Sequence, residues 1–144
     1  MGSCNIVGAF SSGGGGGATT LEASAALTSD FTTTSSSFTD VTGLGITVLN
    51  SSGGVVLVSA TLTTERSTSG GTNYSLENDG TRISSSWASF EMETGGNKKN
   101  VSMGTSLDSD GSVIQVAAYT GGGTLTVRGS TSGATSSINS IGVA

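Results

Sequence analysis

The chain has 144 residues, a net charge of −5, one cysteine, no histidine and no proline. Ser, Thr and Gly make up half of it, and its five basic residues exclude an extended phosphate-binding surface, which needs clustered Lys and Arg. Disordered chains are normally rich in charge and proline, whereas Thr favours strands. The composition therefore predicts one folded β-domain with a thin core.

Residues 1–18 are predicted to form a separate N-terminal arm. Ile6, Val7 and Phe10 precede a run of five glycines, 13–17, which behaves as a flexible tether. Two interpretations are open: a disordered terminus, or an apolar anchor that orders on another protein. No apolar run approaches the ~20 residues of a membrane span, and no basic segment of a signal peptide is present, so we expect neither membrane insertion nor export.

In residues 19–144, apolar and polar residues alternate over short segments that are separated by glycines, which is typical of short strands joined by turns. Leu21 to Leu27 alternate as a first strand, and residues 35–48 read as strand, glycine turn, strand. Val55 to Val58 is apolar at every position, which predicts a central strand buried on both faces. The pattern continues through an Asn-Asp-Gly hairpin at 78–80.

The second half of the chain repeats this pattern. Residues 87–92 predict a strand, and Asp110-Gly111 predicts a hairpin turn before a second strand with two apolar faces, Val113 to Tyr119. Gly121 to Gly123 predicts another turn, and Ile138 to Val143 a last strand. We therefore expect an all-β, antiparallel sandwich or jelly roll of about eight to ten short strands.

The thin core and the unprotected strand edges predict an oligomer. A domain of this size must offset roughly 1–2 kcal/mol of backbone entropy per residue, and few large side chains are present to do so. Proline and lysine, which commonly protect edge strands, are absent or rare. Burial of a further apolar face between subunits is the expected remedy.

The residue inventory argues against catalysis. Without histidine there is no Ser-His-Asp triad, and zinc sites become rare. Asp108 and Asp110 resemble part of a calcium loop, but Tyr119 stands where the loop needs a glutamate, so a turn is favoured. Glu91 and Glu93 share a strand face and are best explained as a solvated edge. We predict no enzyme, no metal and no cofactor.

Several segments, taken in order, resemble a known family. The block Phe38 to Val48, the strand 55–62, the hairpin 79–83, the late strand 124–129 and the ending 137–144 are together similar to small virion proteins of tailed phages. These are jelly-roll proteins of phage heads and tail appendages, with a fold like that of the tumour-necrosis-factor and C1q trimers. Residues 1–17 have no counterpart in the resemblance.

The resemblance implies a structural virion protein that decorates or cements the outer head surface as a homotrimer. It would be assembled in the host cytoplasm, and its partner would be the major capsid protein, without nucleic acid or membrane. Ile6, Val7 and Phe10 would anchor the arm on the capsid. One face of the Val113 to Tyr119 strand would lie in the core and the other at the three-fold axis, with these interface candidates: Val113, Ile114, Val116, Ala118 and Tyr119.

An alternative role is a host-glycan-binding module of a tail or head fibre. Jelly-roll lectins bind sugars through polar loops, usually with an exposed aromatic platform. Trp87, Tyr74 and Tyr119 are the candidates for such a platform, although packing in a core or between subunits explains each of them as well. The resemblance occurs in both head and tail proteins and leaves the two locations open.

Overall fold

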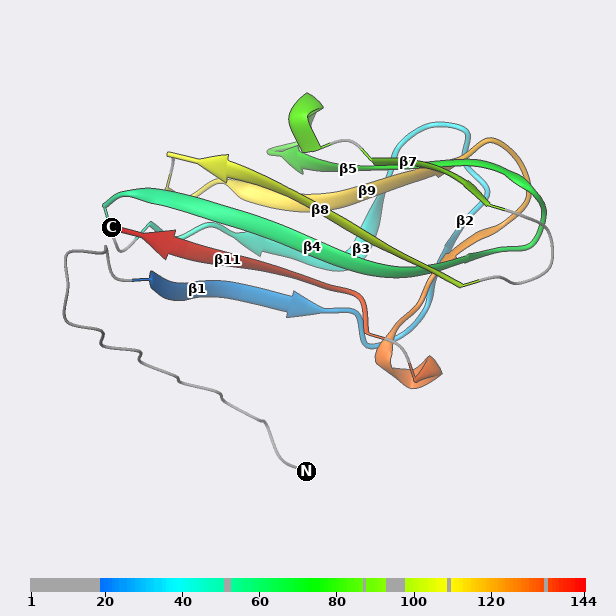
Figure 1. The fold of residues 1–144 in the computed structure, drawn as a ribbon, viewed down its shortest axis with the longest axis horizontal. Helices are drawn as coiled ribbons and strands as arrows, with labels where there is room; N and C mark the ends of the chain where they lie inside the picture. The colour runs from blue at the N-terminus through cyan, green and yellow to red at the C-terminus, as the bar shows by residue number, and fades with distance from the viewer. Residues whose placement is uncertain (1–18, 51–52, 87, 93–97, 109, 134) are drawn as a thin grey trace.

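The computed structural model is a sandwich of two antiparallel β-sheets packed face to face (Figure 1). It describes residues 19–50, 53–86, 88–92, 98–108, 110–133 and 135–144. Apart from strands, these residues form two short 3₁₀ turns, η1 (Ser84–Ser86) and η2 (Ser130–Ser132). The predicted all-β antiparallel sandwich is confirmed. No helix in the described part of the chain has the length and apolar character needed to span a bilayer.

The first sheet is organised around β4 (Val55–Arg66), the longest strand. One edge of β4 pairs with two strands in succession, and its other edge pairs with β8. Beyond these lie β1, next to β11, and β2, next to β10. The bounds are β1 (Thr19–Ala26), β2 (Phe31–Thr33), β8 (Lys99–Leu107), β10 (Leu125–Val127) and β11 (Ser137–Val143).

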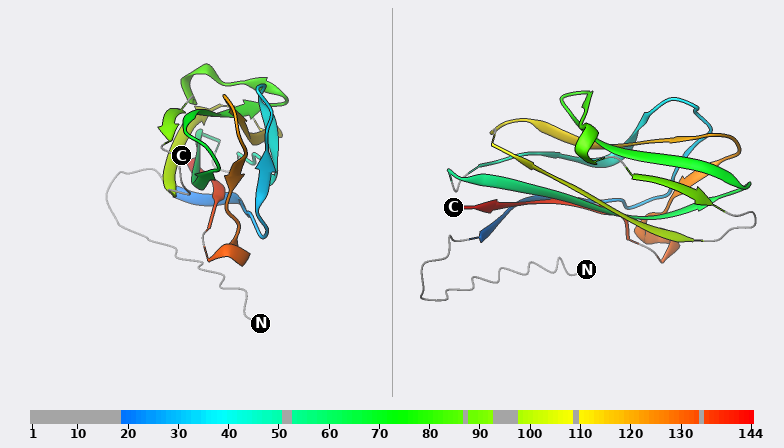
Figure 2. Two further views of the ribbon diagram at one scale, coloured as in Figure 1. Left: turned by 90° about the vertical axis from the view of Figure 1, so that its right-hand side faces the viewer. Right: turned by 45° about the horizontal axis from the view of Figure 1, so that its top comes forward.

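The second sheet lies across the core from the first (Figure 2). Its central strand β9 pairs with β3 on one side and β5 on the other, and β5 also pairs with β6 and β7. The bounds are β3 (Thr39–Thr47), β5 (Gly70–Asn78), β6 (Thr81–Arg82), β7 (Ala88–Met92) and β9 (Val113–Thr120). The described residues thus hold eleven strands, three of which have only two or three residues.

The core between the sheets consists mainly of small and branched apolar side chains. Tyr74 is the only aromatic among the fully buried described residues. The other buried side chains come from the inward positions of both sheets, as strand alternation requires. The largest apolar ones are Val41, Leu44, Val48, Val56, Val58, Leu62, Leu76, Ile114, Leu125 and Ile138.

The segment 35–48 differs from the sequence prediction, because its glycines form a bulge within one strand. Asp40 pairs with Ala117 and Gly45 with Gln115, so β3 advances five residues where β9 advances two. Gly43 has a φ of 95° inside this bulge. Val41 and Leu44, on either side of it, both have no exposed area. The extra residues therefore place two apolar side chains in the core without reversing the chain.

The turn predictions had mixed outcomes. Asp79 and Gly80, with φ values of 48° and 76°, close the predicted hairpin between β5 and β6. Asp110-Gly111 does turn the chain, and Gly111 has a φ of 82°. It connects β8 of the first sheet to β9 of the second, so the predicted hairpin there is wrong. Local turn chemistry does not specify which sheet the following strand joins.

Gly129 marks a close approach of two backbone segments at the first sheet. Gly129 comes shortly after β10 in the sequence. The connection between β1 and β2, which contains Ser29, passes next to it. A Cβ atom at Gly129 would lie 2.5 Å from the carbonyl carbon and 2.7 Å from the amide nitrogen of Ser29. Backbone cannot move aside as a flexible side chain does, so only glycine fits here.

Gly129→Ala is expected to lower the free energy of unfolding by about 2 kcal/mol or more, because the new methyl group overlaps the Ser29 backbone. Gly45→Ala is the matched control, since its nearest contacts would be ordinary ones at 3.7 Å. Urea denaturation of both variants measures the difference. Equal stability of the two would contradict the close approach.

Candidate interaction surface

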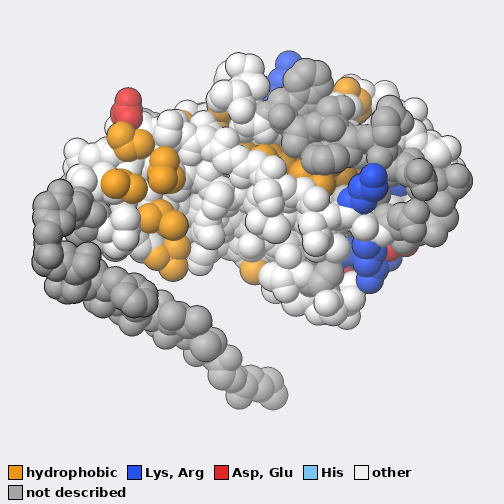
Figure 3. All heavy atoms as spheres, viewed as in Figure 1, with side chains coloured by type: hydrophobic (Ala, Val, Ile, Leu, Met, Phe, Trp, Pro, Cys, Tyr) orange, Lys and Arg blue, Asp and Glu red, His pale blue; other side chains and the backbone are white. Residues whose placement is uncertain are grey.

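Five apolar side chains gather on the outer face of the first sheet, at the end where β1 begins and β11 ends. We call Leu21, Val55, Leu57, Ile141 and Val143 the apolar patch. Leu21 is 59% exposed, Leu57 48%, Val55 40% and Ile141 36%. Figure 3 shows orange side chains grouped at this end of the molecule.

Strand register aligns the apolar patch in two rows. Ile141 lies between Leu21 of β1 and Leu57 of β4, its direct cross-strand neighbours. Val143 lies between Thr19 and Val55 in the same way. Cross-strand neighbours on one face have their Cβ atoms about 5 Å apart, so the five side chains form one continuous surface.

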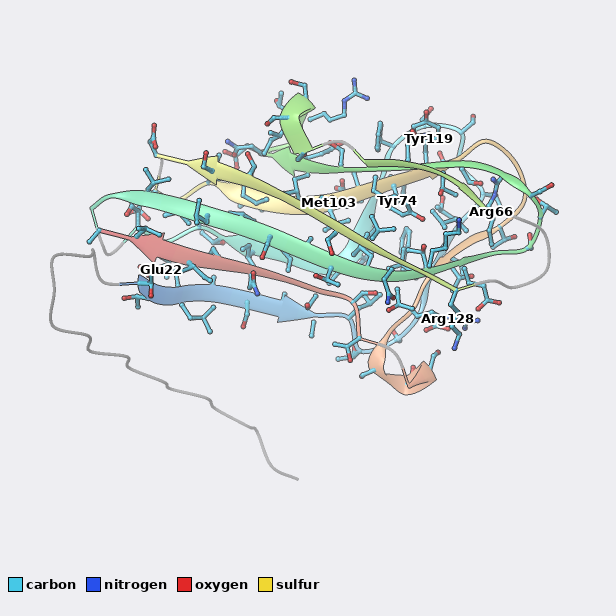
Figure 4. The ribbon with its side chains drawn as sticks, in the orientation of Figure 1. Glu22, Arg66, Tyr74, Met103, Tyr119 and Arg128 are labelled. Atoms are coloured by element: carbon cyan, nitrogen blue, oxygen red, sulfur yellow. The ribbon has the colours of Figure 1, made fainter. Side chains whose placement is uncertain are left out.

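A bulge in β1 explains why Leu21 is exposed. The register shifts between Leu21 and Ala23, which brings Leu21 opposite Ile141 and Ala23 opposite Ser140. Ala23 and Ala25 pack against the core, whereas Leu21 points outward. The predicted alternation from Leu21 to Leu27 is therefore interrupted. The half-buried Glu22 lies at this bulge and is a charged residue next to the patch (Figure 4).

The strand 55–58 also differs from its prediction. It is central in its sheet, but only the side facing the core is buried: Val56 and Val58 are at most 2% exposed. Val55 and Leu57 are open on the other side. The four consecutive apolar residues predicted a strand that is buried on both faces. In the single subunit only one face of this strand is buried.

Beyond the apolar patch the same face carries uncharged polar side chains. Ser59 and Thr61 of β4 continue the outward positions, beside Gly104 and Ser102 of β8. The Ser59 hydroxyl donates to Oδ1 of Asn139 on β11. Farther along, the Thr63 hydroxyl donates to Oδ1 of Asn100 over 3.1 Å.

The ion-paired groups of this face lie at the opposite end from the patch. Arg128 Nη1 donates to Oδ2 of Asp30 at 2.6 Å, and its Nε donates to Oε2 of Glu65 at 3.1 Å. The three side chains are about one quarter exposed. The face thus changes from apolar through uncharged to ionic along its length, and Figures 3 and 4 show these two ends.

A second arginine, Arg66, joins the start of β5 to the β9–β10 connection at the same end of the sandwich. It is 2% exposed, and its guanidinium donates to backbone carbonyls of Gly122 (Nε, 2.8 Å) and Gly71 (Nη1, 3.1 Å). Burying the guanidinium N–H groups without hydrogen-bond partners would be costly, and these carbonyls supply the partners. Arg66, the last residue of β4, therefore acts as a structural tie between the start of β5 and the β9–β10 connection.

The predicted trimer-interface residues divide between the two faces of β9. Ile114, Val116 and Ala118 have no exposed area, because they face the subunit's own core. Val113 is 43% exposed on the other face, and Tyr119 there is half-buried. Val113 and Tyr119 are thus the predicted interface residues that stay accessible.

The candidate aromatic residues have different surroundings. Tyr74 is fully buried, and burial raises the pKa of its hydroxyl. Tyr119 packs edge-on against Phe38, with ring centroids 4.8 Å apart. The guanidinium of Arg82 lies 5.0 Å from the centre of the Phe38 ring. Trp87 lies outside the described residues.

The remaining candidates give no reactive site in the described part of the chain. Asp110 Oδ1 accepts the Asn50 amide at 3.0 Å, which is a turn contact. Glu91 pairs through its backbone with Gly71. Ile6, Val7, Phe10 and Glu93 lie outside the described residues. Within the described ranges, no three His, Cys, Asp or Glu side chains gather closely enough to hold a metal ion.

Comparison with known proteins supports the fold and nothing finer. No family model matches the sequence, and no curated protein does. Among solved structures, Eiger TNF from S. frugiperda is similar over 87% of this chain and 94% of that one, with 14% identity and a TM-score of 0.53. The chain therefore has a TNF-like jelly-roll fold. Dimeric latent PorU from Porphyromonas gingivalis matches 94% of this chain and 14% of its own length, with 12% identity and a TM-score of 0.39.

The ionic end generates a pH prediction. Hydrogen bonds from the Ser132 hydroxyl and the Gly129 amide, together with Arg128, lower the pKa of Asp30 from 3.8 to about 2. Above about pH 5 the carboxylate is ionised in both the folded and unfolded chain, and its stabilising contribution is fully present. As the pH falls from about 5 to about 2 the unfolded chain binds the proton first, so stability should decrease.

Asp30→Asn should remove much of this pH dependence, which urea denaturation at pH 2 to 5 measures. Asp108→Asn, an exposed position in the β8–β9 connection, should keep the wild-type slope. An unchanged slope in Asp30→Asn would contradict the assignment of the low pKa to Asp30.

Proposed function

We propose that this chain is a structural virion protein of a tailed phage, which decorates and cements the outer surface of the head as a trimer. The observation that carries the proposal is the outer face of the first sheet, an exposed surface with an apolar end and a broad uncharged middle. Such a face suits contact with other proteins, whereas catalysis requires gathered reactive groups.

The segments that carry the resemblance to phage virion proteins occupy distinct parts of the sandwich. The block 38–48 contains the bulged strand β3, and 55–62 lies in β4. Residues 79–83 contain the β5–β6 turn, while 124–129 and 137–144 contain β10 and β11. The similarity therefore spans both sheets of a TNF-like jelly roll, as expected if it reflects the whole fold.

In this proposal the N-terminal arm attaches the sandwich to the capsid through Ile6, Val7 and Phe10. The first described residue, Thr19, pairs with Val143 of the apolar patch. Eight residues separate Phe10 from Thr19, enough to reach roughly 30 Å when extended. Three arms on one trimer would convert weak individual contacts into tight attachment.

Deletion of residues 1–12 is expected to abolish binding to phage heads while leaving the folded oligomer intact. Co-sedimentation with heads that lack the protein measures binding, and light scattering measures the assembly. The matched point variants are Ile6, Val7 and Phe10 to Ser, which should also lose binding, and Ser3, Ser11 and Ser12 to Ala, which should retain it. Full decoration by the deleted form would refute the anchor.

A glycan-binding module of a tail or head fibre is the second candidate, and the half-exposed Tyr119–Phe38 pair favours it. An edge-on aromatic pair next to Arg82 offers a small apolar platform with a cationic rim. If this role is correct, a glycan array should show binding that Tyr119→Ala abolishes. Binding to heads without any glycan signal would support decoration instead.

A further inference from the structure

The apolar patch requires an occupant, and its surroundings restrict what that occupant is. Four of its side chains are between 36% and 59% exposed, and they lie next to one another across three strands. Contiguous exposed apolar surface of this kind marks an interaction site in soluble proteins. The proposed function places two partners within reach, the capsid and another copy of this chain.

The electrostatics of the face favour a second copy. From the patch through Ser59 and Thr61 to Thr63, the outward positions of β4 carry no charge, and the neighbouring β8 positions from Gly104 to Ser106 are also uncharged. Fully buried interface centres are depleted of charge, and two identical uncharged surfaces meet without repulsion. Among the described residues, the acidic and basic side chains that pair with one another on this face lie at the far, ionic end.

The size of the face also matches a protein partner. Four strands about 4.8 Å apart, each with about eight residues at 3.3 Å, present roughly 500 Å² before side-chain relief is counted. A stable interface uses about 800 Å² of accessible surface per partner, which is the same order. The three apolar residues of the arm would cover the patch itself and leave the hydroxyl-bearing rows uncovered.

We propose that copies of this chain pack against one another through the outer face of the first sheet, with the apolar patch as the apolar part of the contact. This inference rests on the trimer of the proposed function and moves its interface from β9 to β1, β11 and β4. Ser59, Thr61 and Asn139 then lie at the polar rim. The contact covers the outward side of residues 55–58, which a single subunit leaves open.

Two pairs of matched variants test the location of the contact. Val55→Asp in the patch is compared with Val113→Asp on β9, because the two valines are 40% and 43% exposed. Leu57→Asp is compared with Leu49→Asp, whose leucines are 48% and 49% exposed. All four side chains are accessible in one subunit, so each variant should fold, which far-UV circular dichroism checks.

Light scattering over a dilution series is the readout. Val55→Asp and Leu57→Asp should raise the concentration at which the assembly dissociates to 14.0 kDa subunits by more than about 30-fold. Val113→Asp and Leu49→Asp should change it by less than about threefold. Dissociation by Val113→Asp with assembly retained in Val55→Asp would overturn the proposal in favour of β9.

Other outcomes separate this proposal from the proposed function. If wild-type protein stays at 14.0 kDa and deletion of residues 1–12 increases binding of an apolar dye, the arm occupies the patch and the proposal fails. If monomers bind heads and Leu57→Asp abolishes that binding, the capsid occupies it and the proposal again fails. If the patch variants dissociate as expected but wild-type assemblies do not bind phage heads, the contact between copies is supported and the decoration role fails.

Discussion

The strict alternation of β4 is the constraint on which the rest of the structure depends. Over twelve residues its inward side chains build the core, and its backbone pairs with β11, β10 and β8. Its outward side chains change from Val55 and Leu57 through Ser and Thr to Glu65. The inward residues of β4 therefore contribute to the core of the subunit. Its outward residues make the outer face change from apolar to ionic along the strand.

Much of the architecture was predictable because strand alternation and positive-φ glycine turns are local signals. The Asp79-Gly80 hairpin is an example, since both residues adopt the conformation for which that pair is suited. The bulges were not predictable in the same way. Gly43 in β3 resembles a turn residue in sequence, and only pairing with β9 shows that the strand continues through it.

The candidate surface was less predictable than the fold for a related reason. The alternation of the sequence predicts that Leu21 faces the core, and only the bulge at residues 21–23 turns its side chain outward. For Ile141 the sequence predicts no more than a position in the last strand. Which residues become neighbours depends on β1 and β11 being adjacent, a pairing that joins opposite ends of the sequence. The run 55–58 was the one available signal, because its outward residues are apolar without cover from the subunit itself.

The adjacency of β1 and β11 also determines when the fold can be completed. Thr19 pairs with Val143, and β11 fills the space between β1 and β4 (Figure 1). Until the ribosome has released β11, the first strand has no ladder to join and the edge of β4 from Val55 to Thr61 is unpaired. Folding that depends on such distant pairing is intrinsically slow. One edge of β4 therefore stays unpaired from Val55 to Thr61 while residues 67–136 are synthesised, and the seven-residue strand β11 then covers it.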